Sequence, residues 1–307
     1  MVVGKDARPV PRVRSALYIP GHRADFLAKA DQRGADAVIL DLEDAVAGAC
    51  REKARRIASE WIASRPDPRR PLVCVRINGL GEGWLERDLE AVVGPNLTAV
   101  LVPKVRSATD VKTVAEALDA VETAIGIERG HVRIWPLVET VAAVRSAFEI
   151  ASASPRVAYM GGATAEGGDL AHDLGFQWTV EGLETLYLRS KVLLDVRAAG
   201  VQNPMTGLVA RVDDLAAVEA FARQGRQLGY AGCMVIHPAH VEIVNRTFSP
   251  TPEEVRQAKE ILAALKAAEA AGGDLALTYR GRMIDKAMIH IARQLLEDAR
   301  RLGVVSA

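Results

Sequence analysis

The chain has 307 residues, in which 39 lysines and arginines balance 39 aspartates and glutamates. This balance provides no overall field that would draw the protein to nucleic acid or to an anionic membrane, so we exclude both partners. No run of about eighteen apolar residues occurs, and residues 1–14 lack the apolar core of a signal peptide, so the sequence predicts a soluble protein.

The three cysteines, Cys50, Cys74 and Cys233, form no Cys-x-x-Cys pair. This pattern indicates neither a disulfide framework nor a zinc knuckle, and it favours a reducing cytoplasm. Hydrophobic residues make up 49% of the chain and aromatic residues only 5%. An interior built from Ala, Val and Leu is typical of helices packed closely on a sheet, which favours the α/β class.

Short apolar runs alternate with helix-like segments from the N-terminus to about residue 237. The predicted strands are residues 15–20, 37–43, 72–78, 99–105, 132–139, 157–161, 205–209 and 233–237. The predicted helices include residues 23–33, 45–63, 109–124, 141–151, 181–199 and 214–228. Eight βα units predict a parallel (β/α)8 TIM barrel. The alternative, an open doubly wound sheet, usually carries a Gly-rich phosphate turn after its first strand, and residues 20–23 contain one glycine.

The pattern changes after residue 237, which predicts a barrel over residues 1–248 and a C-terminal helical extension over residues 249–307. Residues 238–248 form a short predicted helix, and a second helix begins in the Ser-Pro-Thr-Pro-Glu segment at 249–253 and runs to 271. A last amphipathic helix starts at Asp285. The barrel does not need this extension for closure, so we expect it to cover an active-site mouth or to pack on a neighbouring subunit.

Polar residues lie at or just after the C-terminal ends of most of the predicted strands. They are Asp41, Glu43, Asp44, Arg76, Asn78, Lys104, Glu139, Asp169 and His237. In a βα barrel the C-terminal strand ends converge on one site. Glu139 ends one predicted strand and Asp169 follows the next, at the end of a Gly-rich stretch that leaves space for a ligand. Two carboxylates in this arrangement predict a site for a hard divalent cation such as Mg2+.

Each candidate also has a structural interpretation. Glu139 could form a surface ion pair, and Asp169 could cap a helix. Arg76 lies in an otherwise apolar strand, so it either pairs with a core acid such as Glu43 or faces a bound anion. His237 at a strand end is more often structural than a ligand.

A modest basic cluster follows the first strand. It comprises His22, Arg23 and Lys29, close to a predicted helix N-terminus, where main-chain amides attract phosphate. The alternative is an ordinary solvated helix face.

Six motifs in order along the chain resemble the citrate lyase beta-subunit and malyl-CoA lyase group of the HpcH/HpaI aldolase superfamily. They are residues 14–23 (RSALYIPGHR), 34–46 (GADAVILDLEDAV), 75–79 (VRING), 137–140 (LVET), 168–175 (GDLAHDLG) and 236–238 (IHP). Relatives have Glu-Asp-Leu where this chain has Gly168-Asp169-Leu170, so one carboxylate is lost beside the metal-ligand position.

This resemblance implies a TIM-barrel lyase that binds Mg2+ and acts on a 3-hydroxyacyl-CoA of the citryl-CoA or malyl-CoA type. The products would be an acyl-CoA and a 2-oxoacid, and the assembly would be a homotrimer or homohexamer. The implied roles are metal binding by Glu139 and Asp169, with Glu139 also beside the substrate, and binding of substrate oxygens by Arg76. Further implied roles are CoA contact by Arg23 and Lys29, acid/base chemistry by Asp285 in the 281–285 lid motif, and a hold on metal-bound water by Glu43 and Asp44.

Three alternative functions remain open at the level of sequence. The first is a metal-dependent aldolase acting on a free pyruvate-type substrate without CoA. The second is a thioesterase or a malate-synthase-like activity, because the same enolate chemistry leads to either. The third is a subunit of a citrate lyase complex that works only with a carrier-protein partner.

Overall fold

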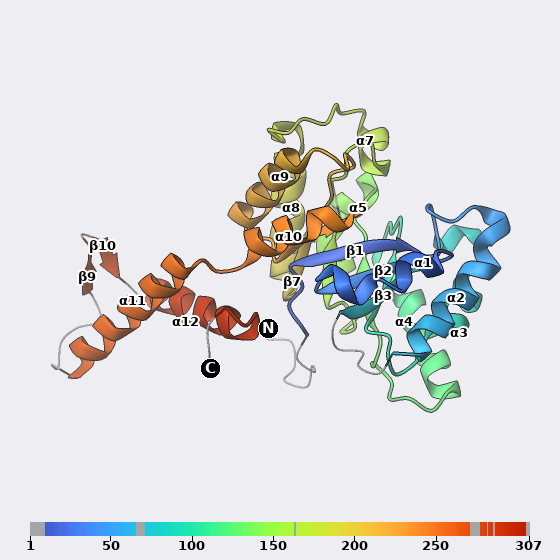
Figure 1. Ribbon diagram of the computed structural model, residues 1–307, viewed down its shortest axis with the longest axis horizontal. Helices are drawn as coiled ribbons and strands as arrows, with labels where there is room; N and C mark the ends of the chain where they lie inside the picture. The colour runs from blue at the N-terminus through green and yellow to red at the C-terminus, as the bar shows by residue number, and fades with distance from the viewer. Residues whose placement is uncertain are drawn as a thin grey trace. The chain divides into compact units, whose positions relative to one another are not determined.

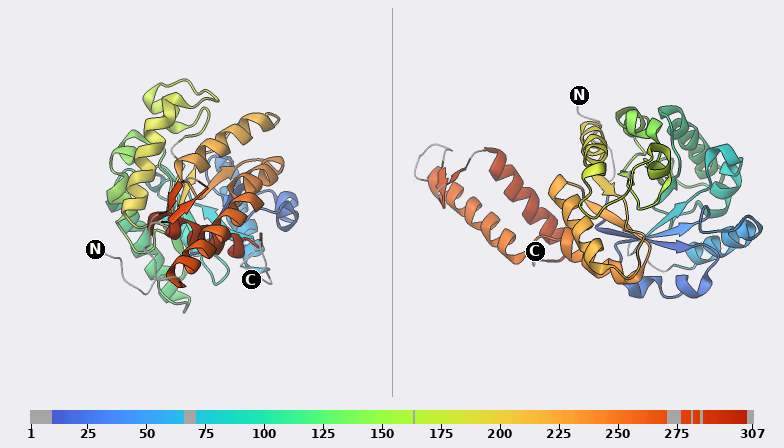
Figure 2. Two further views of the ribbon diagram at one scale, coloured as in Figure 1. Left: turned by 90° about the vertical axis from the view of Figure 1, so that its left-hand side faces the viewer. Right: turned by 90° about the horizontal axis from the view of Figure 1, so that it is seen from above.

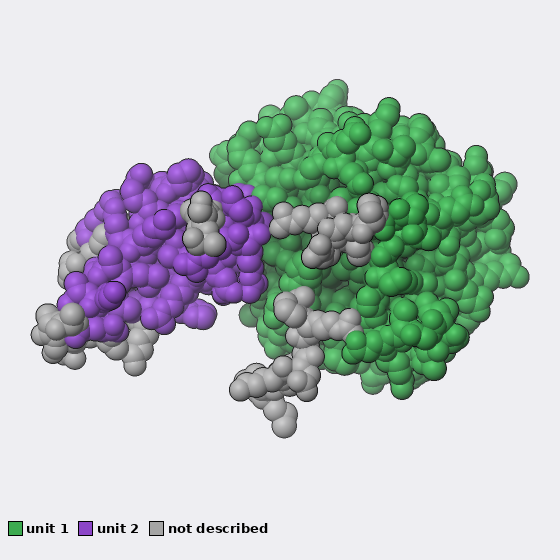
Figure 3. Space-filling model, turned by 60° about the horizontal axis from the view of Figure 1, so that its bottom comes forward, with its two compact units in different colours: residues 1–248 green, residues 249–307 purple. Residues whose placement is uncertain are grey.

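The computed structural model describes residues 10–65, 71–162, 164–270, 277–280, 282–284 and 286–304. The chain divides into two compact units, Met1–Phe248 and Ser249–Ala307, which Figure 3 colours separately. Asp285, the predicted acid/base residue, lies outside the described residues. Within the described chain, no helix is long and apolar enough to cross a membrane.

The first unit is a barrel of eight parallel strands (Figure 1). The strands are β1 (Ser15–Pro20), β2 (Ala37–Asp41), β3 (Leu72–Arg76), β4 (Ala99–Val102), β5 (Arg133–Pro136), β6 (Tyr159–Gly161), β7 (Asn203–Thr206) and β8 (Gly232–Val235). Their order is β5-β4-β3-β2-β1-β8-β7-β6. Parallel bridges between Ile134 and Val157 and between Leu137 and Gly161 join β5 to β6. The predicted TIM barrel is therefore confirmed.

Alternation along the strands separates two apolar layers. Leu17, Val38 and Val75 belong to the large cluster between the strands and the helices. Residues of opposite parity form a second cluster inside the barrel, which includes Ala16 and Trp135. Because successive side chains of a strand point to opposite faces, both layers follow from the apolar runs of the sequence.

The helices of this unit surround the strands (Figure 2). They are α1 (Ala24–Leu27), α2 (Arg51–Ala63), α3 (Leu85–Val92), α4 (Ala108–Ala124), α5 (Val141–Arg145), α6 (Ala147–Ala151), α7 (Asp169–Leu174), α8 (Leu183–Ala198), α9 (Leu215–Leu228) and α10 (Pro238–Phe248). The predicted helix 23–33 is wrong in extent, because the segment forms only α1 and a 3-10 turn, Ala30–Arg33. The predicted helix 141–151 is divided into α5 and α6.

The second unit consists of α11 (Pro252–Ala270), the antiparallel strands β9 (Leu277–Tyr279) and β10 (Arg282–Ile284), and α12 (Lys286–Arg301). Helix α11 begins with a reciprocal cap, in which Glu254 N–H donates to Thr251 Oγ1 and Thr251 N–H donates to a carboxylate oxygen of Glu254. Val255 and Ala258 of α11 pack with Ala292 and Leu296 of α12. The two helices therefore share a small core of their own.

Candidate active site

A cavity of about 400 Å3 opens at the C-terminal ends of the barrel strands. Its charged lining comes from four strand ends and consists of Asp41, Asp44, Arg76, Glu139 and Asp169. Its apolar lining includes Tyr18, Leu137, Leu208, Met234 and Ile236. A concave site with an apolar wall and a few convergent charges is the usual form of a small-molecule site.

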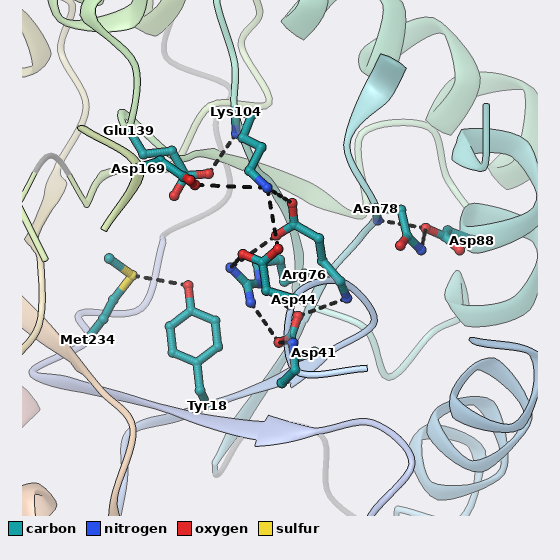
Figure 4. Close-up of polar contacts among 12 residues, drawn as sticks. Tyr18, Asp41, Asp44, Arg76, Asn78, Asp88, Lys104, Glu139, Asp169 and Met234 are labelled. Atoms are coloured by element: carbon teal, nitrogen blue, oxygen red, sulfur yellow. Dashed lines mark hydrogen bonds and ion pairs between the residues drawn. The ribbon is translucent and has the colours of Figure 1, made fainter. Parts of the chain in front are cut away.

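Arg76, the last residue of β3, forms a bidentate ion pair with a carboxylate. Its Nε and Nη2 each donate a 2.7 Å hydrogen bond to one oxygen of Asp41, the last residue of β2. Its Nη1 lies 3.0 Å from Glu43 Oε2 and 3.4 Å from Asp44 Oδ2. Arg76 therefore pairs with core acids, as the first interpretation predicts, and it also lines the cavity, so its contact with a bound anion stays a prediction (Figure 4).

The loop after β2 is folded around the same aspartate. Asp41 Oδ1 accepts the N–H of Glu43 at 3.0 Å, and Oδ2 accepts the N–H of Ala45 at 3.1 Å. Burial alone would lower the pKa of Arg76, but the hydrogen bonds to Asp41 and the nearby negative charges outweigh it and raise that pKa. The guanidinium is therefore a permanent cation in a fixed orientation.

Glu43 is deeply buried, with a side chain 2% exposed. Its two carboxylate oxygens lie 3.0 Å from Arg76 Nη1 and 3.0 Å from Lys104 Nζ. Burial is the largest influence on this carboxyl and raises its pKa to about 7, although both cations act in the opposite direction. Glu43 consequently titrates near neutral pH.

Lys104 connects the acids that follow β2 with Glu139 and Asp169. It follows β4 with φ of 52°, a left-handed conformation that is uncommon outside glycine. Its Nζ lies 3.0 Å from Glu43, 3.3 Å from Asp44 and 3.9 Å from Asp169. Its main-chain N–H donates a 2.7 Å hydrogen bond to Glu139 Oε1. One residue thus contacts four acids.

Glu139 and Asp169 line the same cavity from β5 and β6. Burial raises the pKa of Glu139. Asp169 is the first residue of α7, and Gly168 occupies the cap position, so the capping role considered for Asp169 is wrong. The Asp169 side chain is 50% exposed. Both carboxylates are therefore placed to meet a ligand in the cavity.

These two acids fit a Mg2+ site better than they fit a site in which protein side chains supply every ligand. Among the described residues, no three or more His, Cys, Asp or Glu side chains gather in a group that could hold a metal ion. Mg2+ is usually held by one or two carboxylates and keeps water or substrate oxygens as its other ligands. Two carboxylates on an open cavity match this ligand set.

The glycines near Asp169 have two different functions. Gly162 and Gly168 line the cavity, as expected for residues that leave space for a ligand. Gly161 instead permits the close approach of β6 and β7, because a Cβ at this position would lie 1.7 Å from the carbonyl oxygen of Met205. Part of the Gly-rich signal therefore reflects barrel packing.

Several predicted residues lie away from the cavity lining. Arg23 is paired with Asp25 through hydrogen bonds of 2.7 and 2.8 Å, and Lys29 is exposed. Asn78 donates its side-chain and main-chain N–H groups to buried Asp88, each at 2.8 Å.

His237 also has a structural contact, because its Nδ1 accepts the N–H of Ala239 at 3.3 Å in the first turn of α10. The sequence analysis missed Tyr18 and Met234 as lining residues. The signal that could have found Tyr18 is the alternation of β1, which directs residue 18 to the barrel interior together with Ala16.

Comparison with known proteins identifies the family of this chain. The family model described as HpcH/HpaI aldolase/citrate lyase matches residues 14–238. The chain belongs to this family. A citrate lyase subunit beta-like protein of Deinococcus radiodurans is 38% identical over 94% of this chain and 98% of its own length. A (3S)-malyl-CoA thioesterase of Cereibacter sphaeroides is 34% identical over 96% of this chain and 97% of its own length.

A solved structure of the same family supports the comparison. Mycobacterium tuberculosis CitE, in complex with magnesium, acetoacetate and coenzyme A, aligns with a TM-score of 0.73 and 27% identity over 95% of this chain and 98% of that chain. The predicted membership of the HpcH/HpaI aldolase/citrate lyase family is confirmed. The names of the relatives include both a lyase subunit and a thioesterase, so membership of the family does not fix the reaction.

Proposed function

We propose that this protein is a Mg2+-dependent carbon–carbon lyase that acts on a 3-hydroxyacyl-CoA of the citryl-CoA or malyl-CoA type and gives an acyl-CoA and a 2-oxoacid. The observation that carries the proposal is the meeting of Glu139, Asp169 and Arg76 on one cavity. Support comes from the CitE neighbour, whose complex contains magnesium, acetoacetate and coenzyme A. The name of the (3S)-malyl-CoA thioesterase relative likewise supports a CoA ester as substrate.

In this proposal Glu139 and Asp169 would hold Mg2+, which when bound supplies a Lewis acid and a template for the oxygens of the oxoacid portion. Arg76 would bind a substrate oxygen and stabilise the negative charge that develops there. Asp41 occupies Nε and one hydrogen of Nη2, so the second hydrogen of Nη2 is left to donate to the substrate. Asp41 therefore orients Arg76.

The remaining roles rest on the resemblance of the sequence motifs. We propose that Asp285 moves the proton on or off the α-carbon of the acyl-CoA, and that Arg23 and Lys29 contact CoA. Arg23 would have to leave its exposed ion pair with Asp25 to do so, and such a pair contributes little free energy. Glu43 and Asp44 would hold metal-bound water. The homotrimer or homohexamer also stays a prediction, which light scattering would check.

Hydrolysis of the thioester is the second candidate function, because a relative 34% identical to this chain is named as a (3S)-malyl-CoA thioesterase. Product analysis separates the two. The protein is treated with EDTA, supplied with Mg2+, and incubated with malyl-CoA or citryl-CoA. A lyase releases glyoxylate or oxaloacetate together with acetyl-CoA, whereas a thioesterase releases malate or citrate and free CoA. Release of the free acid with no oxoacid at any time would contradict the proposed lyase.

Two further outcomes would point to an aldolase or to a citrate lyase subunit. Cleavage of a free hydroxy-oxoacid without any CoA ester would favour the pyruvate-type aldolase. Turnover that appears only after an acyl-carrier protein is added would favour a subunit of a citrate lyase complex.

A further inference from the structure

Tyr18 belongs to the cavity but has no part in the roles assigned above. It is the fourth residue of β1, and it packs with the interior cluster of the barrel, whereas its neighbours Leu17 and Ile19 pack with the outer one. Its side chain lines the same cavity as Arg76, Glu139 and Asp169.

The hydroxyl of Tyr18 has a weak partner. Among the described residues, its hydrogen-bond acceptor is the thioether Sδ of Met234, at 3.6 Å. A thioether is a poor acceptor, whereas a buried tyrosine hydroxyl usually finds a strong one. The contrast with Tyr159 is informative, since that hydroxyl donates to the carbonyl oxygen of Pro11 at 3.0 Å. The Tyr18 hydroxyl is thus a donor without a strong acceptor.

The ring of Tyr18 is held in position by its surroundings. The Cζ of Arg76 lies 5.1 Å from the ring centroid, within the range of a cation–π contact. Figure 4 shows the ring beside the ion pair of Arg76 and Asp41, with the Tyr18 hydroxyl directed towards Met234. Burial raises the pKa of the hydroxyl, so the hydroxyl keeps its proton. It can therefore donate a stronger hydrogen bond when a better acceptor than the thioether comes within reach. Arg76 and Tyr18 therefore offer two donors to one cavity.

We propose that, when the substrate binds, the Tyr18 hydroxyl gives up its hydrogen bond to the Met234 sulfur. It donates instead to a carbonyl or carboxylate oxygen of the 2-oxoacid portion of the substrate. This inference rests on the proposed function. An oxygen of a carboxylate or ketone is a much stronger acceptor than a thioether, so the exchange favours binding. Tyr18 then favours substrates that place an oxygen within hydrogen-bonding distance of its hydroxyl.

The test compares two variants with the same chemical change. Tyr18→Phe removes the cavity hydroxyl, and Tyr159→Phe removes the hydroxyl that bonds to Pro11. Binding of pyruvate and of glyoxylate is measured by calorimetry in the presence of Mg2+, with thermal unfolding of each protein recorded alongside. We expect Tyr18→Phe to raise the Kd of the oxoacid by about three- to tenfold with little change in Tm. Tyr159→Phe should lower Tm and leave the Kd within twofold of wild type.

The outcomes distinguish this inference from the function on which it rests. Wild-type protein that binds neither oxoacid with Mg2+ would overturn both. Wild-type binding that Tyr18→Phe leaves unchanged would overturn the role of Tyr18 alone. A fall in Tm for Tyr18→Phe like that of Tyr159→Phe, with an unchanged Kd, would show that the hydroxyl only supports the fold. Affinities of Mg2+ and of CoA alone should be the same for wild type and Tyr18→Phe.

Discussion

The main-chain N–H of Lys104 donates a 2.7 Å hydrogen bond to Oε1 of Glu139, so the backbone of one residue fixes a proposed metal ligand. The side chain of the same lysine lies 3.9 Å from Asp169, the other proposed ligand. The left-handed φ of 52° at Lys104 costs on the order of 1 kcal/mol. A substitution of the side chain leaves the main-chain bond in place, so the two contributions of Lys104 can be separated.

We expect Lys104→Gln to tighten the binding of a divalent cation. The ammonium lies within 4 Å of Glu43, Asp44 and Asp169, where it partly neutralises the charge that attracts a metal. Its side chain is 40% exposed, so solvent screens much of this interaction and the gain is about 1 kcal/mol, or about fivefold in Kd. Titration with Mn2+ monitored by electron paramagnetic resonance would measure it. Weaker binding by this variant would mean that the ammonium instead organises the acids.

The acids themselves should be needed for that binding. Asp169→Asn and Glu139→Gln each remove one negative charge and keep the shape of the side chain. We expect each to raise the Kd for Mn2+ by at least about tenfold, and to lower Mg2+-dependent turnover by roughly 10²- to 10³-fold. Glu149→Gln, at an exposed position of α6, is the matched control for the loss of one charge. Normal metal binding by both site variants would remove Glu139 and Asp169 from the metal site.

The sequence predicted where each strand lies, but it placed most strand ends too late. Leu42, Ile77 and Val105 were assigned to strands because they are apolar, and each is indeed buried, yet each lies in the loop that follows its strand. Apolar periodicity reports burial, and loops at the barrel mouth are buried too. Helix α7 was anticipated only through the cap considered for Asp169 and is not among the predicted helices, because it has just six residues.

Within the site, the sequence predicted which strand ends carry charge but not how the charges pair. The bidentate ion pair between Arg76 and Asp41 depends on the parallel pairing of β2 and β3, which sets the two residues side by side. The contacts of Lys104 depend on a left-handed backbone and on acids 35 to 65 positions away in sequence. Neither relationship leaves a local pattern of residue types.

Glu43 should make stability depend on pH. Its pKa of about 7 in the folded protein lies above the ordinary value of 4.5, so the folded state binds the proton more tightly. The stability from this group is fully present below about pH 4.5 and is lost as pH rises through about 7. Glu43→Gln mimics the protonated form. We expect its advantage in unfolding free energy over wild type to grow from about 1 kcal/mol at pH 5 to on the order of 3 kcal/mol at pH 8.

Urea unfolding of metal-free protein at both pH values would measure this difference. Glu149→Gln again serves as the control, because an exposed carboxylate should give the same difference at pH 5 and pH 8. An advantage of Glu43→Gln that is equal at the two pH values would contradict a titration of Glu43 between them.

Arg76 and Asp41 should behave as one unit in stability and in catalysis. Arg76→Met leaves the Asp41 carboxylate, 2% exposed, with only main-chain donors, so we expect a loss of about 3–5 kcal/mol in unfolding free energy. Asp41→Asn added to this variant should recover part of the loss, with a coupling of about 1–3 kcal/mol in a double-mutant cycle measured by urea unfolding.

Arg76→Lys separates charge from geometry, because lysine keeps the positive charge but cannot reproduce the two 2.7 Å bonds to Asp41. We expect kcat/KM to fall by about 10²- to 10³-fold in this variant while the protein remains folded. Conversely, Arg56→Lys, in an exposed ion pair with Glu60 on α2, should leave both stability and turnover close to wild type. Full activity of Arg76→Lys would show that a positive charge suffices at this position, and additive losses in the double-mutant cycle would show that Asp41 does not orient the guanidinium.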